Sequence, residues 1–254
     1  MNTDNLPVQP PNTLSQIIIT PLEPPQRDTV AIANVTVDDT ITINGIALRE
    51  RKNGNGLYIR MPAKRTTDGT YIDVAHPFSS DVRQALSEKL IDMYETGEFT
   101  YIDNATQNKK YSPQIKVVNC SKYNSGNNFL SRADLIVSSF VVHNVKLRNT
   151  ESGNLTINMP AYLSSTGEYR SIVVPKSKSA FQLLNKAYIN EYSTDYSYRK
   201  ANDESVRQLK SAGIEFQLAK TTSGENLIKF KTTDIDRVTQ ALNKQPVSAS
   251  KIIG

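Results

Sequence analysis

A duplicated pattern constrains the fold of this chain more than any other feature of its sequence. A set of apolar residues, glycines and prolines with fixed spacing occurs once and then again about one hundred residues later. A period of this length is too long for a solenoid repeat and indicates a whole domain copied once. The first copy of the pattern is Leu57, Ile59, Met61, Pro62, Ala63, Gly69, Tyr71 and Pro77, and the second is Leu155, Ile157, Met159, Pro160, Ala161, Gly167, Tyr169 and Pro175.

The repeat sets the predicted domain boundaries. We expect module 1 at residues 16–97 and module 2 at residues 114–192, with a polar linker at 98–113. Residues 1–15 are rich in proline and asparagine without periodicity and are predicted to form a flexible arm. A small C-terminal module is expected at 200–244, followed by a flexible tail at 245–254.

Each copy has the local pattern of an antiparallel sheet followed by a helix. In module 1, apolar residues alternate with polar ones on both sides of the turn Asp38-Asp39, which predicts a hairpin with one buried face. The turn 53–56 supplies residues that tolerate positive φ before the next strand. After Pro77 the period becomes helical, with Ser79 or Ser80 as the N-cap and Gly97 at the end. In module 2, Ser177 or Ser179 takes the capping position.

The predicted fold class is therefore α+β. We expect a tandem duplication of an antiparallel β-sheet module covered by one helix, plus a small C-terminal αββα element. In that element, 203–210 and 234–242 have helical patterns, whereas 214–219 and 227–230 are predicted strands around the turn Ser223-Gly224. The α-β-β-α order resembles a small module of proteins from Gram-positive conjugative elements.

Composition narrows the class of protein. The 254 residues contain one cysteine, Cys120, so no internal disulfide can form, and no apolar run is long enough for a spanning helix. The N-terminus has no secretory pattern, and we expect a soluble, cytoplasmic protein. The formal charge of +5 suits a phosphate-bearing partner, although many soluble proteins are mildly basic.

A longer motif in module 1 carries a family resemblance. Residues 56–65 read Gly-Leu-Tyr-Ile-Arg-Met-Pro-Ala-Lys-Arg, and they are followed by Asp68-Gly69 and by Asp-Val-Ala-His-Pro at 73–77. This order resembles the central signature of the SpoVG family (stage V sporulation protein G, the septation regulator). In module 2 the resemblance is carried by Val-Val-His-Asn at 141–144.

The resemblance implies a small bacterial DNA- and RNA-binding regulator that forms dimers. Binding in the family is attributed to basic residues near the start of the helix after the signature proline. By position, these are Ser79, Ser80 and Arg83 in module 1 and Lys176, Ser177, Lys178 and Ser179 in module 2. A helix N-terminus presents free N–H groups and a partial positive charge, which suits phosphate.

Each copy departs from the family pattern. Module 1 has Asp81 at its helix start, where a carboxylate opposes phosphate, and module 2 has Tyr162-Leu163 in place of Lys64-Arg65. Division of labour between the copies is one explanation, and drift toward a scaffolding role is another. We predict that the two modules form a pseudo-symmetric pair within one chain, so that the protein is a monomeric pseudo-dimer; the alternative is a homo-oligomer in which independent copies pair between chains.

The remaining candidate residues each have a purely structural interpretation as well as a functional one. Alternation places Arg60 on the solvent side of its strand, so Arg60, Lys64 and Arg65 either contact phosphate or form a solvated sheet face. The tyrosines either stack on the bases of a single strand or pack in the core and linker; they are Tyr188, Tyr192, Tyr196 and Tyr198.

Signals for catalysis and metal binding are weak. His76 and His143 fall at different places in the repeat without neighbouring ligands, and each is expected to be a turn or hydrogen-bonding residue. Cys120 has no evident partner base. We therefore expect no enzyme activity, no catalytic residues, no metal and no cofactor.

Two functional hypotheses follow. The first is a nucleic-acid-binding regulatory protein, with DNA favoured over RNA, of bacterial, plasmid or phage origin. The second is a protein-interaction or assembly adaptor, acting in conjugation or against host defence, that uses the fold as a scaffold and binds a protein partner through the C-terminal module. No membrane partner is expected.

Overall fold

The computed structural model divides the chain into two compact units, Met1–Tyr192 and Ser193–Gly254. The structure describes residues 14–243 except 53, 55, 104–112, 124–127, 165–166 and 221–224. The predicted arm up to residue 13, the turn Ser223-Gly224, the C-terminal tail and most of the predicted linker therefore lie outside the described residues.

Module 1 is a meander of antiparallel strands, as the alternation predicts. β1 (Leu14–Gln26), β2 (Thr29–Val37), β3 (Ile41–Glu50) and β4 (Leu57–Arg60) pair in chain order. The alternating apolar residues of this hairpin are fully buried, and Asp38 and Asp39 turn the chain with positive φ. The buried residues are Ala31, Ala33, Val35 and Val37 on β2 and Ile41, Ile43, Ile46 and Leu48 on β3. One face of this hairpin therefore forms the module's core.

Helix α1 (Ser80–Thr96) packs its apolar side onto this sheet. The Ser79 hydroxyl accepts a hydrogen bond from the N–H of Val82, so Ser79 is the N-cap, and Gly97 ends the helix with φ +78°. The buried residues of α1 are Leu86, Leu90 and Met93, spaced three and four apart as a helical face requires.

Module 2 repeats the plan. Its sheet consists of β9 (Ile115–Lys122), β10 (Phe129–Val137), β11 (Phe140–Asn149) and β12 (Leu155–Asn158), followed by α3 (Lys178–Tyr192). Leu184 and Tyr188 of α3 are fully buried, and the Tyr188 hydroxyl donates to the carbonyl of Val145. The predicted α+β class, with one helix after each antiparallel sheet, is confirmed.

Both modules also carry a short two-stranded hairpin that lies apart from the main sheet. In module 1 it is formed by β5 (Ala63–Arg65) and β6 (Tyr71–Asp73), and in module 2 by β13 (Ala161–Leu163) and β14 (Tyr169–Ser171). The segment after α1, predicted as linker, begins with a strand, β8 (Thr100–Ile102), that pairs with the outer edge of β1. Tyr101 packs against the core there, and three residues are too few to show a periodic signal.

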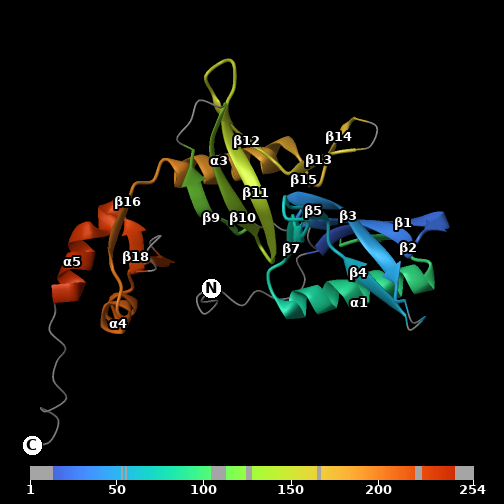
Figure 1. Ribbon diagram of the computed structural model, residues 1–254, viewed down its shortest axis with the longest axis horizontal. Helices are drawn as coiled ribbons and strands as arrows, with labels where there is room; N and C mark the ends of the chain where they lie inside the picture. The colour runs from blue at the N-terminus through green and yellow to red at the C-terminus, as the bar shows by residue number, and fades with distance from the viewer. Residues whose placement is uncertain are drawn as a thin grey trace, which may run out of the picture. The chain divides into compact units, whose positions relative to one another are not determined.

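The modules are joined by a reciprocal exchange of strands. β7 (Ala75–Pro77), from module 1, pairs antiparallel with β11 of module 2, whereas β15 (Val173–Pro175), from module 2, pairs with β3 of module 1. Figure 1 shows β7 beside β11 and β15 beside β3. β7 pairs with the same edge of β11 as β12 does, and β15 pairs with the same edge of β3 as β4 does.

Backbone hydrogen bonds show that the exchange is pseudo-symmetric. The N–H of His143 donates to the carbonyl of Val74 at 2.8 Å, and the N–H of Asn44 donates to that of Ile172, also at 2.8 Å. A second matched pair runs from Phe78 N to Ser139 O at 2.7 Å and from Lys176 N to Thr40 O at 2.8 Å. One continuous buried core consequently includes residues of both modules.

The C-terminal unit is a three-stranded antiparallel sheet with two helices. β16 (Tyr196–Lys200) and β17 (Gln217–Lys220) flank β18 (Asn226–Lys231), and α4 (Asp203–Ser211) and α5 (Ile235–Asn243) complete the unit after a 3₁₀ turn at Thr232–Asp234. The two helices and β18 occur within one residue of their predicted bounds, whereas β17 begins three residues later than the predicted strand 214–219. Strand β16 adds a β element before the expected αββα order, and its tyrosines and cations gave no apolar alternation.

Within the described residues, no helix combines the length and the apolar character that a membrane crossing requires.

The junction generates a test with a matched control. Val173 in β15 is fully buried, whereas its neighbour Val174 is 38% exposed. Replacing Val173 by threonine buries a hydroxyl in the shared core, and we expect Val173→Thr to lower the free energy of unfolding by about 1–2 kcal/mol. Val174→Thr, with the same change of atoms on the exposed side, should cost less than about 0.5 kcal/mol. Equal effects in urea denaturation would contradict the placement of β15.

Candidate nucleic-acid interface

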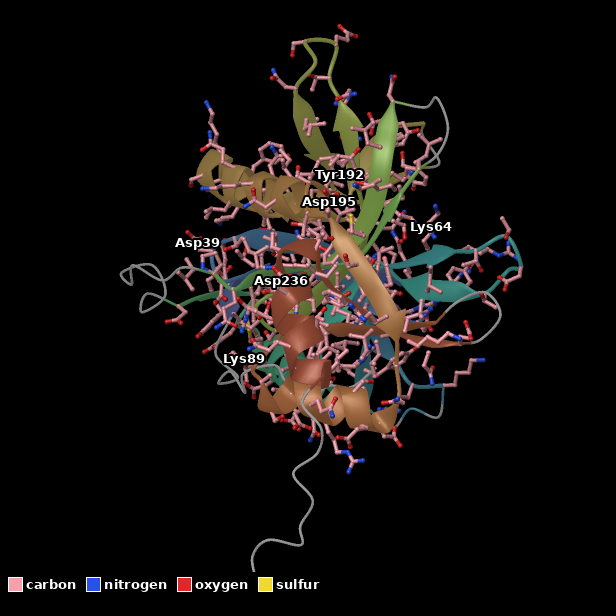
Figure 2. All side chains as sticks on the ribbon, turned by 90° about the vertical axis from the view of Figure 1, so that its left-hand side faces the viewer. Asp39, Lys64, Lys89, Tyr192, Asp195 and Asp236 are labelled. Atoms are coloured by element: carbon pink, nitrogen blue, oxygen red, sulfur yellow. The ribbon has the colours of Figure 1, made fainter. Side chains whose placement is uncertain are left out.

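The β5–β6 hairpin gathers the basic residues predicted from module 1. The side chains of Lys64 and Arg65 are exposed on β5, and Figure 2 labels Lys64 on this hairpin. The guanidinium of Arg60, at the end of β4, lies 5.1 Å from the ring centre of Tyr71 on β6. Tyr71 is 60% exposed, so the hairpin presents an accessible aromatic ring together with three cations.

The tip of the same hairpin holds one carboxylate. Asp68 accepts hydrogen bonds from the hydroxyls of Thr66 and Thr70 and from the N–H of Thr70. These bonds, first those from the Thr66 and Thr70 side chains, lower the pKa of Asp68 to about 2. The tip therefore carries a negative charge, and the guanidinium of Arg65 lies beside it, with its Nε 3.4 Å from the carbonyl oxygen of Gly69.

The start of α1 is less basic than the resemblance implies. Ser79 is occupied as the N-cap, and the Ser80 hydroxyl donates to Asp81 at 3.3 Å. Arg83 forms an ion pair with Asp73, at the end of β6, at 3.3 Å. This ion pair ties the helix start to the hairpin but neutralises Arg83.

The start of α3 is the more open of the two helix starts. The Ser177 hydroxyl accepts from the N–H of Ala180 at 3.1 Å and lies 2.8 Å from the hydroxyl of Ser179, so Ser177 caps the helix. The Lys176 ammonium donates to the side chain of Gln16, in module 1, at 2.7 Å. Lys178 is exposed, and it forms no ion pair with the part of the chain that the structure describes.

The second hairpin has a different surface. On β13–β14, Tyr162 and Leu163 occupy the positions of Lys64 and Arg65, and Leu163 is 58% exposed. Tyr169 is 79% exposed, and the one cation on these strands, Arg170, lies 3.8 Å from Glu168. The structure thus places the predicted residues in three groups: Arg60, Lys64 and Arg65 on β4 and β5, Ser79, Ser80 and Arg83 at the α1 start, and residues 176–179 at the α3 start.

Comparison with known families decides what these modules are. The SpoVG family model matches residues 13–96 and again residues 114–194, which together make up well over half of the chain. The chain belongs to the SpoVG family. The two matches correspond to the duplicated α+β modules, which together form unit Met1–Tyr192.

Relatives named "Putative septation protein SpoVG" each match about one module's length. The protein of Staphylococcus epidermidis is 36% identical over 85 residues, which is 33% of this chain and 81% of the relative. The protein of Staphylococcus aureus is 39% identical over 77 residues, or 30% of this chain and 75% of the relative. The protein of Macrococcus caseolyticus is 40% identical over 68 residues, and the match spans 27% of this chain and 57% of that relative.

The junction of the two SpoVG modules contains a pair of histidines that sequence spacing did not bring together. Nε2 of His76, on β7, lies 2.9 Å from Nε2 of His143, on β11. On the outer sides, Nδ1 of His76 is 2.7 Å from the carbonyl oxygen of Pro77, and Nδ1 of His143 is 3.2 Å from Oδ2 of Asp134. The pairing depends on the strand exchange, which is a tertiary feature.

These contacts determine how many protons the pair carries when every hydrogen bond is made. A carbonyl and a carboxylate only accept, so both Nδ1 atoms carry hydrogen. One further hydrogen must lie between the two Nε2 atoms. The carboxylate of Asp134 faces the His143 end of the histidine pair of the SpoVG junction.

The hydrogen bond between His143 and Asp134 shifts the pKa values of both residues. The hydrogen bond to Asp134 raises the pKa of His143 above 6.5, although partial burial opposes the shift. Burial acts to raise the pKa of Asp134, but hydrogen bonds from His143, Asn119 and Asn144 outweigh it and hold the pKa below 3.8. The contribution of His143 to stability is complete below pH 6.5 and is lost as the pH rises through its raised pKa.

The pseudo-symmetric position has no ionisable side chain in place of either histidine. The counterpart of His143 is Asn44, whose side chain donates to the carbonyl of Ser171 at 3.2 Å, and the counterpart of His76 is Val174. Among the described residues, no cluster of three or more histidine, cysteine, aspartate or glutamate side chains could hold a metal ion.

A second titratable group lies where the turns of the two modules meet. The Ser138 hydroxyl, in the β10–β11 turn, donates to Asp38, in the β2–β3 turn. Burial raises the pKa of Asp38 to about 6, because the ionised carboxylate loses water at this position.

The raised pKa of Asp38 predicts a stability change with pH. Because the folded pKa exceeds the unfolded value, this group costs stability as the pH rises from about 4 to 6. Asparagine keeps the acceptor for Ser138 but cannot ionise. We expect Asp38→Asn to raise the free energy of unfolding at pH 7 by about 2 kcal/mol and to change it by less than about 0.5 kcal/mol at pH 3.5. Denaturant titration at both pH values measures this, and a difference independent of pH would contradict the burial of an ionised carboxylate.

Proposed function

We propose that the tandem SpoVG modules form a nucleic-acid-binding regulatory protein whose affinity comes largely from phosphate contacts. The observation that carries this proposal is the β5–β6 hairpin, where Arg60 lies over the exposed ring of Tyr71 and Arg65 is opposite Tyr71 in the strand register. Lys64 is exposed on the other face of the same hairpin. Cations supply phosphate contacts, and a helix start with Lys178 and Ser177 adds a second phosphate-binding point.

The two modules imitate a dimer inside one chain. The exchanged strands β7 and β15 hold them in a fixed mutual position, as an intermolecular exchange would do in a pair of separate modules. The basic hairpin of module 1 and the basic helix start of module 2 are then two unlike contact points on one rigid unit. A pair with unlike halves does not require a palindromic target.

Phosphate-driven binding has a characteristic salt dependence. The logarithm of the association constant for a short duplex should fall linearly with the logarithm of salt concentration, with a slope of about −0.9 per phosphate neutralised.

Two substitutions on α3 that change the net charge by the same amount then test the contact site. Lys178→Glu, at the start of α3, should weaken duplex binding on every sequence and make the salt slope shallower by about one unit.

The matched control is Lys186→Glu, an exposed residue further along α3. It changes the net charge equally and should leave the salt slope unchanged. Fluorescence anisotropy with a labelled duplex gives both quantities. Absence of binding at low salt would refute the proposal, and equal losses in the two variants would remove the α3 start from the interface.

A protein-interaction role is the second candidate, and the β13–β14 hairpin favours it. Tyr162, Leu163 and Tyr169 form an exposed apolar surface where module 1 is basic. If this surface binds a protein, Leu163→Ser should abolish co-purification of that partner from the host after nuclease treatment. The control is Ile72→Ser, which changes the exposed aliphatic residue of the β5–β6 hairpin and should leave co-purification intact. Unchanged capture by Leu163→Ser would exclude the hairpin as the docking surface.

A further inference from the structure

The sheet of the C-terminal unit has one covered face and one open face. On β18, Ile228 and Phe230 are buried together with Leu209 of α4 and Val238 of α5. Successive residues of a strand point to opposite faces. Leu227, Lys229 and Lys231 therefore lie on the face that α4 and α5 leave open.

Strand pairing adds the neighbouring residues of that face. Tyr196 is opposite Lys231, Tyr198 is opposite Lys229, and Lys200 is opposite Leu227. Residues directly opposite each other in an antiparallel pair share a face. The other residues of β16 confirm this division, because Arg199 donates to the hydroxyl of Thr239 on α5 at 3.0 Å.

The open face combines aromatic rings with positive charge. Tyr198 is 54% exposed, and the Lys229 ammonium lies 3.8 Å from the ring centre of Tyr196. Lys200 is at the edge, where its ammonium pairs with Glu225 at 3.0 Å. At the described open-face positions of β16 and β18 there are two tyrosines, three lysines and one leucine, and no acidic residue.

We infer that this open face, formed by Tyr196, Tyr198, Lys229 and Lys231, binds single-stranded nucleic acid. Unpaired bases stack on accessible tyrosine rings, and the lysines beside the rings neutralise the phosphates. Tyr198 is the exposed ring of this face, whereas Tyr196 is half-buried with Lys229 over it. Tyr196 and Tyr198 are two residues apart on one strand, so their Cα atoms are separated by about 7 Å along it. An extended single strand can place neighbouring bases on the two rings.

The composition of the face argues for this occupant over two others. A duplex keeps its bases stacked inside the helix and cannot use the tyrosine rings in this way. A protein partner would be expected to bury aliphatic surface, whereas Leu227 is the one aliphatic residue among the described open-face positions of β16 and β18. The inference concerns Ser193–Gly254 and is independent of the function proposed for the SpoVG modules.

The test uses the full chain and a fluorescein-labelled oligo(dT) of about 20 nucleotides, which has no secondary structure. Removing the ring in Tyr198→Ala should weaken binding by about 5- to 150-fold, since one stacked base contributes about 1–3 kcal/mol. Tyr198→Phe keeps the ring and should bind oligo(dT) within about threefold of the parent protein.

The matched control is Tyr169→Ala, which removes an exposed tyrosine from the β13–β14 hairpin. It should leave oligo(dT) affinity unchanged. Tyr198→Ala should in turn leave duplex affinity unchanged, so that failure of the module interface and failure of this site are distinguishable. Lack of oligo(dT) binding at low salt, or equal affinity of Tyr198→Ala and Tyr169→Ala, would overturn the inference. An equal loss of duplex and single-strand affinity in Tyr198→Ala would also overturn it, because the face would then not contact bases.

Discussion

The reciprocal pairing of β7 with β11 and of β15 with β3 is the interaction on which unit Met1–Tyr192 depends. Each module gives away one three-residue strand and receives another, so neither completes the edge of its own sheet. The backbone groups of Asn44 and His143 find their acceptors only in the other module. Separation of the modules would leave these groups without partners and open a shared apolar core, which makes the tandem arrangement a single folding unit.

Pseudo-symmetry of the backbone is accompanied by divergence of the side chains. The position that holds His143 and Asp134 in module 2 holds Asn44 and Asn34 in module 1, and each pair lies at the same bulge of the sheet. The hairpins differ in the same way, basic in module 1 and apolar in module 2. A homodimer must carry any substitution twice, whereas a fused pair can change one half alone. The chain can therefore assign phosphate contacts and other contacts to different halves.

Much of the fold could be predicted because short stretches of sequence determine it. Alternation in β2 and β3, the cap at Ser79 and the positive φ at Gly97 each follow from a few neighbouring residues. The strand exchange could not be predicted, because β7 and β15 have the same local pattern whichever sheet receives them. For the same reason, His76 and His143 gave no signal: they are far apart in sequence and meet only through that exchange.

The site predictions succeeded where local pattern sufficed and failed where tertiary contacts decided the outcome. Exposure of Arg60 followed from alternation, but the ion pair between Arg83 and Asp73 required the hairpin to fold back beside α1. Strand β16 was missed because its alternating residues are tyrosines and cations, not aliphatics, and this unusual alternation is itself the basis of the single-strand surface. A search for period-two aromatic and basic residues would have found it.

Native-state hydrogen exchange of the junction amides tests the central claim most directly. The N–H groups of Asn44, His143, Phe78 and Lys176 all donate across the junction. If the modules form one cooperative unit, Asn44 and His143 should exchange with the free energy of global unfolding of unit Met1–Tyr192, as the central strands do. Exchange of these two amides at the rate of exposed backbone, while the core of each module stays protected, would contradict the account.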